Sequence, residues 1–172
     1  MQLGKLAAWY FTDSMNAADA QGFARRIERW GYHALWIPEA VGRDPFAHAA
    51  WLLSGTQRLV IATGIANIYA RDANAMQGAQ KTLAEQSDGR FLLGLGVSHA
   101  PMVEGMRGHA YGPPIASMRA YLERMRAAPY MAPPPAEPPP IVLAALGPKM
   151  LALAAEQTQG AHPYNVNPEH TA

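Results

Sequence analysis

A glycine-rich run that ends in a serine and a histidine offers the first candidate chemistry. It reads GLGVSH and extends from Gly94 to His99, with Gly96 and Ser98 inside it. A dinucleotide-binding turn would need a third glycine where His99 stands and a helix directly after it, which Pro101 opposes. We therefore interpret the glycines as strand positions that let another backbone or a flat ring come close.

The same run nearly matches the nucleophile elbow of serine hydrolases, G-x-S-x-G, with Ser98 in the place of the nucleophile. An elbow needs a helix immediately after the serine, and we expect Pro101 and Gly105 to oppose a helix there. His162, later in the chain, is the candidate base for such a serine. A serine hydrolase that uses Ser98 is therefore a distant alternative.

Further polar residues fall in the segments between the apolar runs. His99, His109, His162 and Glu39 lack the i, i+4 spacing of helical zinc ligands, so we expect no metal site. Residues of these types in loops are more often solvated than bound to a metal ion.

A Gly-Pro pair, Gly147 and Pro148, follows an apolar run and opens a predicted helix. The first turn of that helix offers free N–H groups and partial positive charge to an anion such as phosphate. An ordinary helix start explains the pair equally well.

Short apolar runs alternate with longer amphipathic segments, and this alternation predicts the elements that position these residues. The predicted strands are 5–11, 33–37, 58–63, 91–97, 141–146 and 160–164. The predicted helices are 17–30, 45–53, 75–86, 115–127 and 148–157. We expect residues 12–14 to cap the first helix, Gly31 to end it, and Asp72 to cap the third.

The order of these elements indicates an α/β fold. Several strands are continuous apolar runs, which is typical of parallel strands buried on both faces. Strand–helix units repeating about every 30 residues indicate right-handed βαβ crossovers. A (β/α)8 barrel typically needs ~250 residues, so the length of 172 residues alone would favour an open sheet. In either case ligands bind beyond the carboxyl ends of the strands.

Composition narrows the class of protein. The chain has 14 Lys and Arg against 13 Asp and Glu, a balance that argues against a nucleic-acid-binding or polybasic membrane-binding module. Cysteine is absent, which excludes disulfides, thiolate nucleophiles and iron–sulfur clusters. No apolar run approaches ~18 residues, so we expect no membrane span and a cytoplasmic protein.

Four segments together resemble the luciferase-like monooxygenase superfamily, and most closely its oxidoreductases that use the deazaflavin coenzyme F420. They are GYHALWIPE (31–39), RLVIATGIANIYARDA (58–73), GRFLLGLGVSH (89–99) and LAALGPKMLALAAEQTQGAHPY (143–164). The resemblance runs over nearly the whole chain in the right order. It implies a TIM barrel, (β/α)8 in type but incomplete with about six parallel strands, instead of the open sheet.

The resemblance also implies a reaction and a site. The reaction is hydride transfer between coenzyme F420, or FMN, and a small organic substrate. The ring would lie at the barrel mouth against a bulge after the third strand, with a non-prolyl cis peptide between Gly64 and Ile65. The implied catalytic residues are His99, as first candidate for the proton donor, and Glu39. The implied coenzyme-binding residues are Gly64, Ile65, Ala66, Asn67, Gly96, Val97, Ser98, Ala145, Leu146, Gly147 and His162.

Members of that superfamily are longer than this chain, and the resemblance implies that the seventh and eighth strands are missing. We therefore expect one luciferase-like TIM-barrel domain, residues 1–172, truncated at its C-terminus. The other interpretation is a homodimer in which two copies complete a barrel. An inactive or non-catalytic truncated family member is the main alternative to an oxidoreductase.

Overall fold

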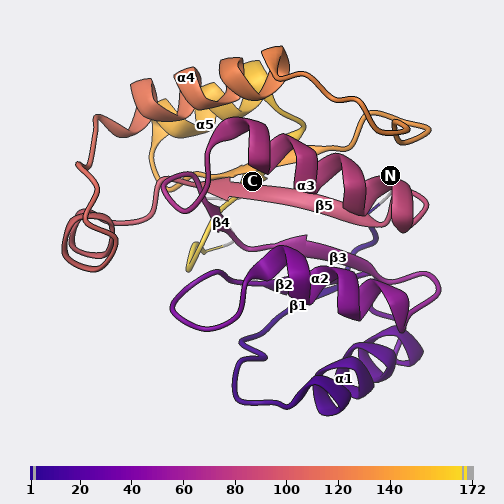
Figure 1. The fold of residues 1–172 in the computed structure, drawn as a ribbon. Coiled ribbons are helices and arrows are strands. Elements are labelled where there is room, and N and C mark those ends of the chain that lie inside the picture. Colours follow the sequence, from indigo (N-terminus) through magenta and orange to yellow (C-terminus); the bar gives the residue numbers. More distant parts are fainter. Residues whose placement is uncertain (2, 168, 170–172) are drawn as a thin grey trace.

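A computed structural model of the chain describes residues 1, 3–167 and 169 (Figure 1). In these residues the strands form one parallel sheet in the order β1-β2-β3-β5-β6-β7, with the short β4 paired to β5. The strands are β1 (Ala7–Trp9), β2 (Ala34–Ile37), β3 (Val60–Thr63), β4 (Ala66–Asn67), β5 (Phe91–Gly96), β6 (Ile141–Ala144) and β7 (Gly160–His162). The helices are α1 (Ala17–Arg29), α2 (Pro45–Ser54), α3 (Ala73–Gln86), α4 (Pro114–Ala127) and α5 (Pro148–Gln157), with a π-helical turn, η1 (Pro101–Met106).

The predicted α/β order is confirmed. The structure adds two short elements that were not predicted, β4 and η1, and the other differences lie at the ends of elements. The predicted strand 5–11 is shortened to β1, since its neighbour β2 ends before Pro38 and leaves little backbone to pair with. Asn16, not residues 12–14, caps α1 by accepting a hydrogen bond from the Asp19 N–H. Asp72 caps α3 as predicted, and Gly31 after α1 has the positive φ expected of it.

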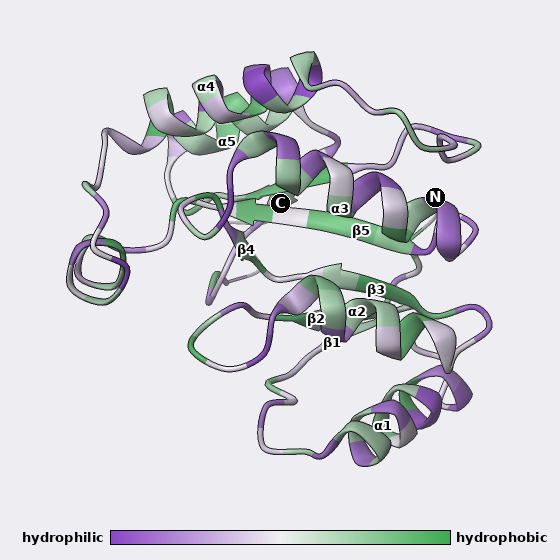
Figure 2. Cartoon of the chain, viewed as in Figure 1, coloured by the Kyte–Doolittle hydropathy of each residue, from purple (hydrophilic) through white to green (hydrophobic). Residues whose placement is uncertain are grey.

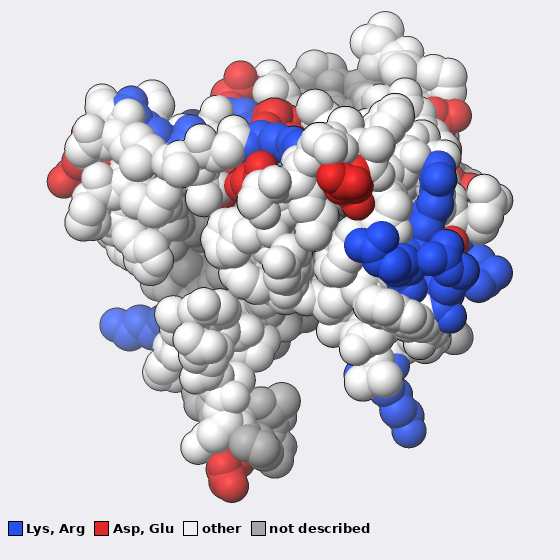
Figure 3. All heavy atoms as spheres, turned by 90° about the horizontal axis from the view of Figure 1, so that it is seen from below, with Lys and Arg blue, Asp and Glu red and all other residues white. Residues whose placement is uncertain are grey.

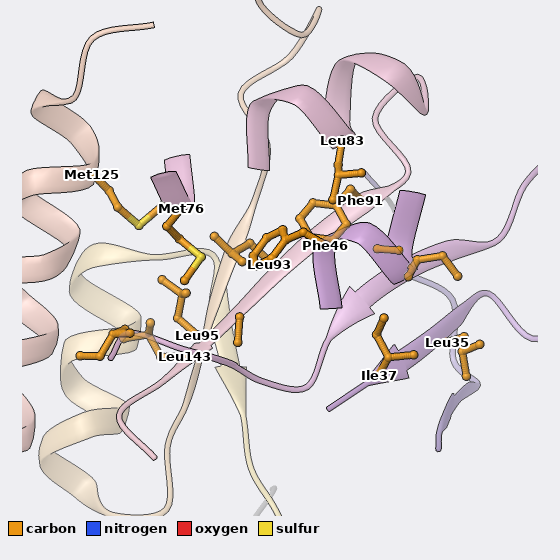
Figure 4. Close-up of a cluster of buried hydrophobic side chains, with 14 of the residues drawn as sticks. Leu35, Ile37, Phe46, Met76, Leu83, Phe91, Leu93, Leu95, Met125 and Leu143 are labelled. Atoms are coloured by element: carbon orange, nitrogen blue, oxygen red, sulfur yellow. The ribbon is translucent and has the colours of Figure 1, made fainter. Parts of the chain in front are cut away.

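The two faces of the sheet are covered differently. On the outer face β3 and β5 lie behind α2 and α3 (Figure 1), and Leu35, Phe91 and Leu95 pack with helix residues such as Phe46 and Met76 (Figure 4). The strands are hydrophobic almost throughout, while the helices present hydrophilic residues outward (Figure 2). The inner face holds a smaller cluster made only of strand residues: Ala34, Val60, Ala62, Leu92 and Val142, with Trp36 packed against them.

Inner-face residues are buried without a covering helix because the sheet curls on itself. Trp36 on β2 and His162 on β7 make an edge-on ring contact with centroids 4.4 Å apart, although three strands separate β2 from β7 in the sheet. The ring centroids of Trp9 on β1 and of Tyr164, just after β7, lie 5.9 Å apart. The fold is therefore an incomplete TIM barrel, and the open sheet that length alone would favour is wrong.

A bulge interrupts the pairing of β3 with β5. Ala62 pairs with Leu92 and Ala66 pairs with Leu95, so one more residue lies on the β3–β4 side than on the β5 side. The Thr63 hydroxyl spans the opening: it donates to the Gly94 carbonyl (2.8 Å) and accepts from the Gly94 N–H (2.9 Å). Both backbone groups of Gly94 thus have partners where the ladder opens.

Charge is spread unevenly over the surface. In the view from below, Lys and Arg side chains gather at the right, with a few acidic side chains beside and among them (Figure 3). Helix α1 lies on this side and carries the exposed Arg25, Arg26 and Arg29. A net charge of +1 therefore conceals a local basic group, which the overall balance did not predict. Within the described residues, no helix combines the length and apolarity needed to cross a membrane.

Substitution of Gly94 tests the bulge. A Cβ at this position would lie 2.0 Å from the Thr63 carbonyl oxygen, a backbone atom that cannot move aside cheaply. We expect Gly94→Ala to lower the free energy of unfolding by about 2–3 kcal/mol in urea denaturation. Gly78→Ala is the control, because nothing lies within 4 Å of a Cβ there. Because Gly78 lies in helix α3, alanine there should instead raise that free energy by up to about 1 kcal/mol. Similar effects of both substitutions would contradict the close approach of Gly94 to Thr63.

Candidate active site at the carboxyl ends of the strands

Gly64 lies where the carboxyl ends of β1, β3 and β7 meet. The indole N–H of Trp9 donates a hydrogen bond to the Gly64 carbonyl oxygen (3.0 Å). A Cβ on Gly64 would lie 3.0 Å from that indole nitrogen and 3.1 Å from Nε2 of His162. A side chain at this position would therefore crowd the two rings, which would have to shift by a few tenths of an ångström.

The peptide bond between Gly64 and Ile65 is cis, as the resemblance implies. It lies inside the bulge, and the Ile65 carbonyl accepts a hydrogen bond from the Glu39 N–H (3.2 Å). The Ile65 side chain fills the space that a side chain on Gly96 would need, since a Cβ there would lie 2.4 Å from Cδ1 of Ile65. The structure thus brings together Gly64, Ile65 and Gly96, three of the predicted coenzyme-binding residues.

Ala66 and Asn67, also predicted to bind the coenzyme, lie behind this surface. Both are buried, and they form β4 by pairing with Leu95 and Gly96. The Asn67 side chain accepts a hydrogen bond from the Tyr69 N–H (2.9 Å). These residues support the bulge from the sheet side.

Glu39 is held by partners on both carboxylate oxygens. Its side chain is only 6% exposed. Oε2 accepts hydrogen bonds from the Asn67 N–H (2.8 Å) and from Nη1 of Arg71 (2.9 Å). Oε1 lies 3.8 Å from Nη2 of Arg107. Glu39 therefore joins β2, the β4–α3 connection and the segment after β5, and its predicted catalytic role stays a prediction.

Arg71 extends this network toward α2. Its Nη2 pairs with Asp44 at 2.6 Å, and its guanidinium lies 4.7 Å from the centre of the Phe46 ring. Burial alone would lower the pKa of Arg71, but hydrogen bonds and charge from Glu39 and Asp44 raise it overall. Burial acts to raise the pKa of Asp44, yet hydrogen bonds from the Ala47 N–H and Arg71 lower it overall. Both groups are thus held in their charged forms.

The predicted residues after β5 form the rim of the site. His99 is exposed, and its carbonyl accepts hydrogen bonds from the N–H groups of Met102 and Val103 at the start of η1. Ser98 has a φ of 57°, and its carbonyl accepts a hydrogen bond from the Tyr111 hydroxyl (3.2 Å). In the described part of the chain, no hydrogen bond joins the Ser98 hydroxyl to a histidine, so no serine-hydrolase arrangement is present there.

The expectation that Pro101 and Gly105 oppose a helix is wrong. The π-helical turn η1 begins at Pro101 and includes Gly105. A proline is tolerated in the first turn because the N–H that it lacks has no partner within the helix. This turn is visible as the coil at the left of Figure 1, near the carboxyl end of β5.

The predicted residues after β6 lead into α5. Ala145 is buried, and its N–H lies 3.4 Å from the His162 carbonyl, whereas the Leu146 side chain is exposed. Gly147 is the N-cap of α5, with no side-chain hydrogen bond at that end of the helix and open space around the glycine. Val97, at the end of β5, is half-buried and packs against the main core.

The aromatic residues around Gly64 were not predicted as site residues. Trp9 and Trp36 stand at matched positions on the neighbouring strands β1 and β2. Their common place near the strand ends is a sequence signal that could have identified them. His109 lies elsewhere, at a cavity of about 670 Å³ between the β4–α3 connection and α4. Among residues 1, 3–167 and 169, no three His, Asp or Glu side chains are grouped to hold a metal ion.

Comparison with known proteins identifies the family. The model of the luciferase-like monooxygenase family matches residues 1–172. The chain belongs to this family. A relative from Mycobacterium tuberculosis, whose name proposes a coenzyme F420-dependent oxidoreductase, is 33% identical over 98% of this chain and 56% of its own length. The chain spans about half the length of the curated relatives it matches.

Solved structures share the luciferase-like fold. The F420-dependent tetrahydromethanopterin reductase of Methanopyrus kandleri superimposes with a TM-score of 0.76 at 17% identity, over 92% of this chain and 55% of the reductase. The oxygenating constituent of 3,6-diketocamphane monooxygenase from Pseudomonas putida, solved with FMN, gives 0.74 at 14% identity, over 91% and 57% of the two chains. At these identities the likeness establishes the fold.

The link from Asp44 to Arg71 predicts a pH-dependent contribution to stability. Since folding lowers the pKa of Asp44, its contribution is complete above the ordinary value of 3.8 and is lost as the pH falls through the lower folded value. We expect Asp44→Asn, which keeps a helix-capping side chain, to cost about 0.5–1 kcal/mol at pH 7. The difference from the parent protein in urea denaturation should shrink below about pH 4.

The control for this prediction is Asp88→Asn. Asp88 is exposed and has a φ of 53°, a conformation that asparagine also adopts. This substitution should change stability less at pH 7. A pH-independent cost at Asp44 would show that its charge is not what holds Arg71.

Proposed function

We propose that this protein is an oxidoreductase that transfers a hydride between coenzyme F420, or FMN, and a small organic substrate. The observation that carries the proposal is the bulge at Gly64–Ile65, flanked by the rings of Trp9, Trp36 and His162 in a member of the luciferase-like family. The names of the M. tuberculosis relative and the M. kandleri reductase specify F420, and the P. putida protein holds FMN. These names support the choice of coenzyme.

The residues at the mouth suit a flat ring bearing an anionic tail. The rings of Trp9 and Tyr164 are partly exposed, and beside them Gly64 offers bare backbone because it has no side chain. The amino end of α5 at Gly147 is uncapped by any side chain and has open space around it, which suits a phosphate. We assign the ring to the Gly64 side of the mouth and the tail to α5.

The coenzyme, when bound, supplies the hydride chemistry, and the protein supplies position and a proton. Trp9 fixes the carbonyl of Gly64 and so the surface on which the ring rests. Glu39 fixes the other side of the bulge through the Asn67 N–H. For reduction of a carbonyl, one imidazole donates a proton to the substrate oxygen as the carbon receives the hydride; the reverse reaction returns the proton.

His162 is the imidazole that the geometry favours for this proton transfer. It lies against Trp36 and beside Gly64, while the earlier candidate, His99, stands exposed on the rim. An imidazole suits the role because its ordinary pKa lies near neutrality. Both residues remain in the proposal, with His162 first.

Coenzyme binding is the direct test of the proposed function. Isothermal titration calorimetry of the protein with F420, with FMN and with NADP as a control should give saturable binding for one of the first two only. Binding without oxidation of the reduced coenzyme, across a panel of carbonyl and enoyl compounds, would favour the alternative of a non-catalytic family member. If neither F420 nor FMN binds, the proposal fails.

Substitution of the two histidines distinguishes their roles. We expect His162→Ala to lower turnover by about 100-fold or more while changing coenzyme affinity much less, because a positioned acid or base typically contributes that much. His99→Ala should stay within about twofold of the parent, since no contact ties its ring to the bulge. Turnover is followed as oxidation of the reduced coenzyme with the best substrate of the panel. The opposite ranking would return the role to His99.

A further inference from the structure

Arg107 is a cation beside the bulge with too few partners. It follows η1 directly, and its backbone N–H bonds to the Met102 carbonyl (3.3 Å). The side chain is about one quarter exposed, yet its Nε is buried and has no hydrogen-bond partner. Among the described residues, its one charged contact is the 3.8 Å approach of Nη2 to Oε1 of Glu39.

The neighbouring Arg71 contacts the same carboxylate and, unlike Arg107, forms hydrogen bonds with its acidic partners. Arg71 reaches Glu39 at 2.9 Å and Asp44 at 2.6 Å, which are hydrogen-bonding distances. Glu39 also accepts the Asn67 N–H at Oε2, whereas Arg107 approaches the other oxygen, Oε1, without reaching hydrogen-bonding distance. A guanidinium has five N–H donors in a rigid fork. In Arg107 the Nε donor is buried without an acceptor, and Nη2 comes no nearer than 3.8 Å to Glu39. A buried donor without a partner in a native structure calls for an explanation.

The position of Arg107 points to a ligand as the missing partner. Glu39, which Arg107 approaches, donates its N–H to the Ile65 carbonyl within the bulge. Glu39 thus connects Arg107 to the bulge at the carboxyl ends of the strands. The coil of η1 just before it stands at the end of the molecule where the strands finish (Figure 1).

We propose that Arg107 binds an anionic group, a phosphate or a carboxylate, of the ligand that occupies the mouth. The planar fork of an arginine matches two oxygens of such a group, and a charge-assisted pair would give the buried Nε donor an acceptor. The anion belongs either to the coenzyme or to the substrate, and in this respect the inference rests on the proposed function. The competing explanation is a purely structural role, in which Arg107 holds η1 in place through an ion pair with Glu39. An ion pair with that role would be expected to form at hydrogen-bonding distance.

Three variants make the test. Arg107→Gln removes the charge and most donors, and Arg107→Lys keeps the charge but not the fork. Arg58→Gln is the matched control, because it removes one exposed arginine just before β3, at the opposite end of that strand from the bulge. Thermal unfolding of each variant measures any loss of stability separately from binding.

The first arm asks whether the anion is the coenzyme's. Calorimetric affinities are measured for FMN and for riboflavin, which differ only in the phosphate, and likewise for F420 and its deazaflavin core without the tail. We expect Arg107→Gln to reduce the preference for the phosphate-bearing form by about tenfold or more. Arg107→Lys should retain part of the preference, and Arg58→Gln all of it.

The second arm asks whether the anion is the substrate's. Inorganic phosphate and benzoate are titrated into the coenzyme-free and coenzyme-loaded protein. If Arg107→Gln spares the preference for the coenzyme phosphate but weakens binding of phosphate or benzoate about tenfold, the substrate is anionic and the proposal stands. The titrations into coenzyme-free protein need no coenzyme, so they remain informative if the proposed function fails.

Equal affinities of the parent protein and Arg107→Gln in both arms would overturn the proposal. A lower unfolding temperature of Arg107→Gln with unchanged anion binding would overturn it as well, and would show that Arg107 stabilises η1 and does not bind a ligand. Equal losses in Arg107→Gln and Arg58→Gln would have the same consequence, because they would reflect overall charge alone.

Discussion

The close approach of Thr63 to Gly94 is the constraint on which the mouth of this barrel depends. One side-chain hydroxyl takes over both backbone groups of Gly94, so the chain after β3 can leave the sheet for one residue without exposing unpaired polar groups. The absence of a side chain at residue 94 is a condition for this approach. The bulge that results presents Gly64 to Trp9 and His162.

A chain of charges fixes the opposite side of the bulge. Glu39 reaches the backbone of Asn67, Arg71 reaches Glu39, and Asp44 reaches Arg71 while it begins α2. Glu39 and Asp44 both lie on the connection from β2 to α2, whereas Asn67 lies in β4 and Arg71 on the connection from β4 to α3, so these contacts tie together two segments that are well separated in the sequence. Its buried carboxylate is best understood as a support for the bulge, which is compatible with a location close to the reacting groups.

The sequence allowed the order of elements and the location of the mouth to be predicted, because buried parallel strands have a recognisable apolar pattern and share one carboxyl edge. The family resemblance located the Gly64–Ile65 bond within that edge. The contacts of His162 with Trp36 and Gly64 could not be predicted, since they join strands that are not neighbours and depend on how strongly the sheet curls. Nor could the helical turn at Pro101, because proline is compatible with the first turn of a helix as well as with a loop.

The placement of the indoles has an optical consequence. Trp9 and Trp36 stand at the mouth, whereas the other two of the four tryptophans, Trp30 and Trp51, lie on the outside of the molecule near α1 and in α2. A chromophore that settles beside Gly64 would be within a few ångströms of one pair and far from the other. Such a chromophore would therefore quench Trp9 and Trp36 most strongly, and the intrinsic emission of this protein would report occupancy without any label.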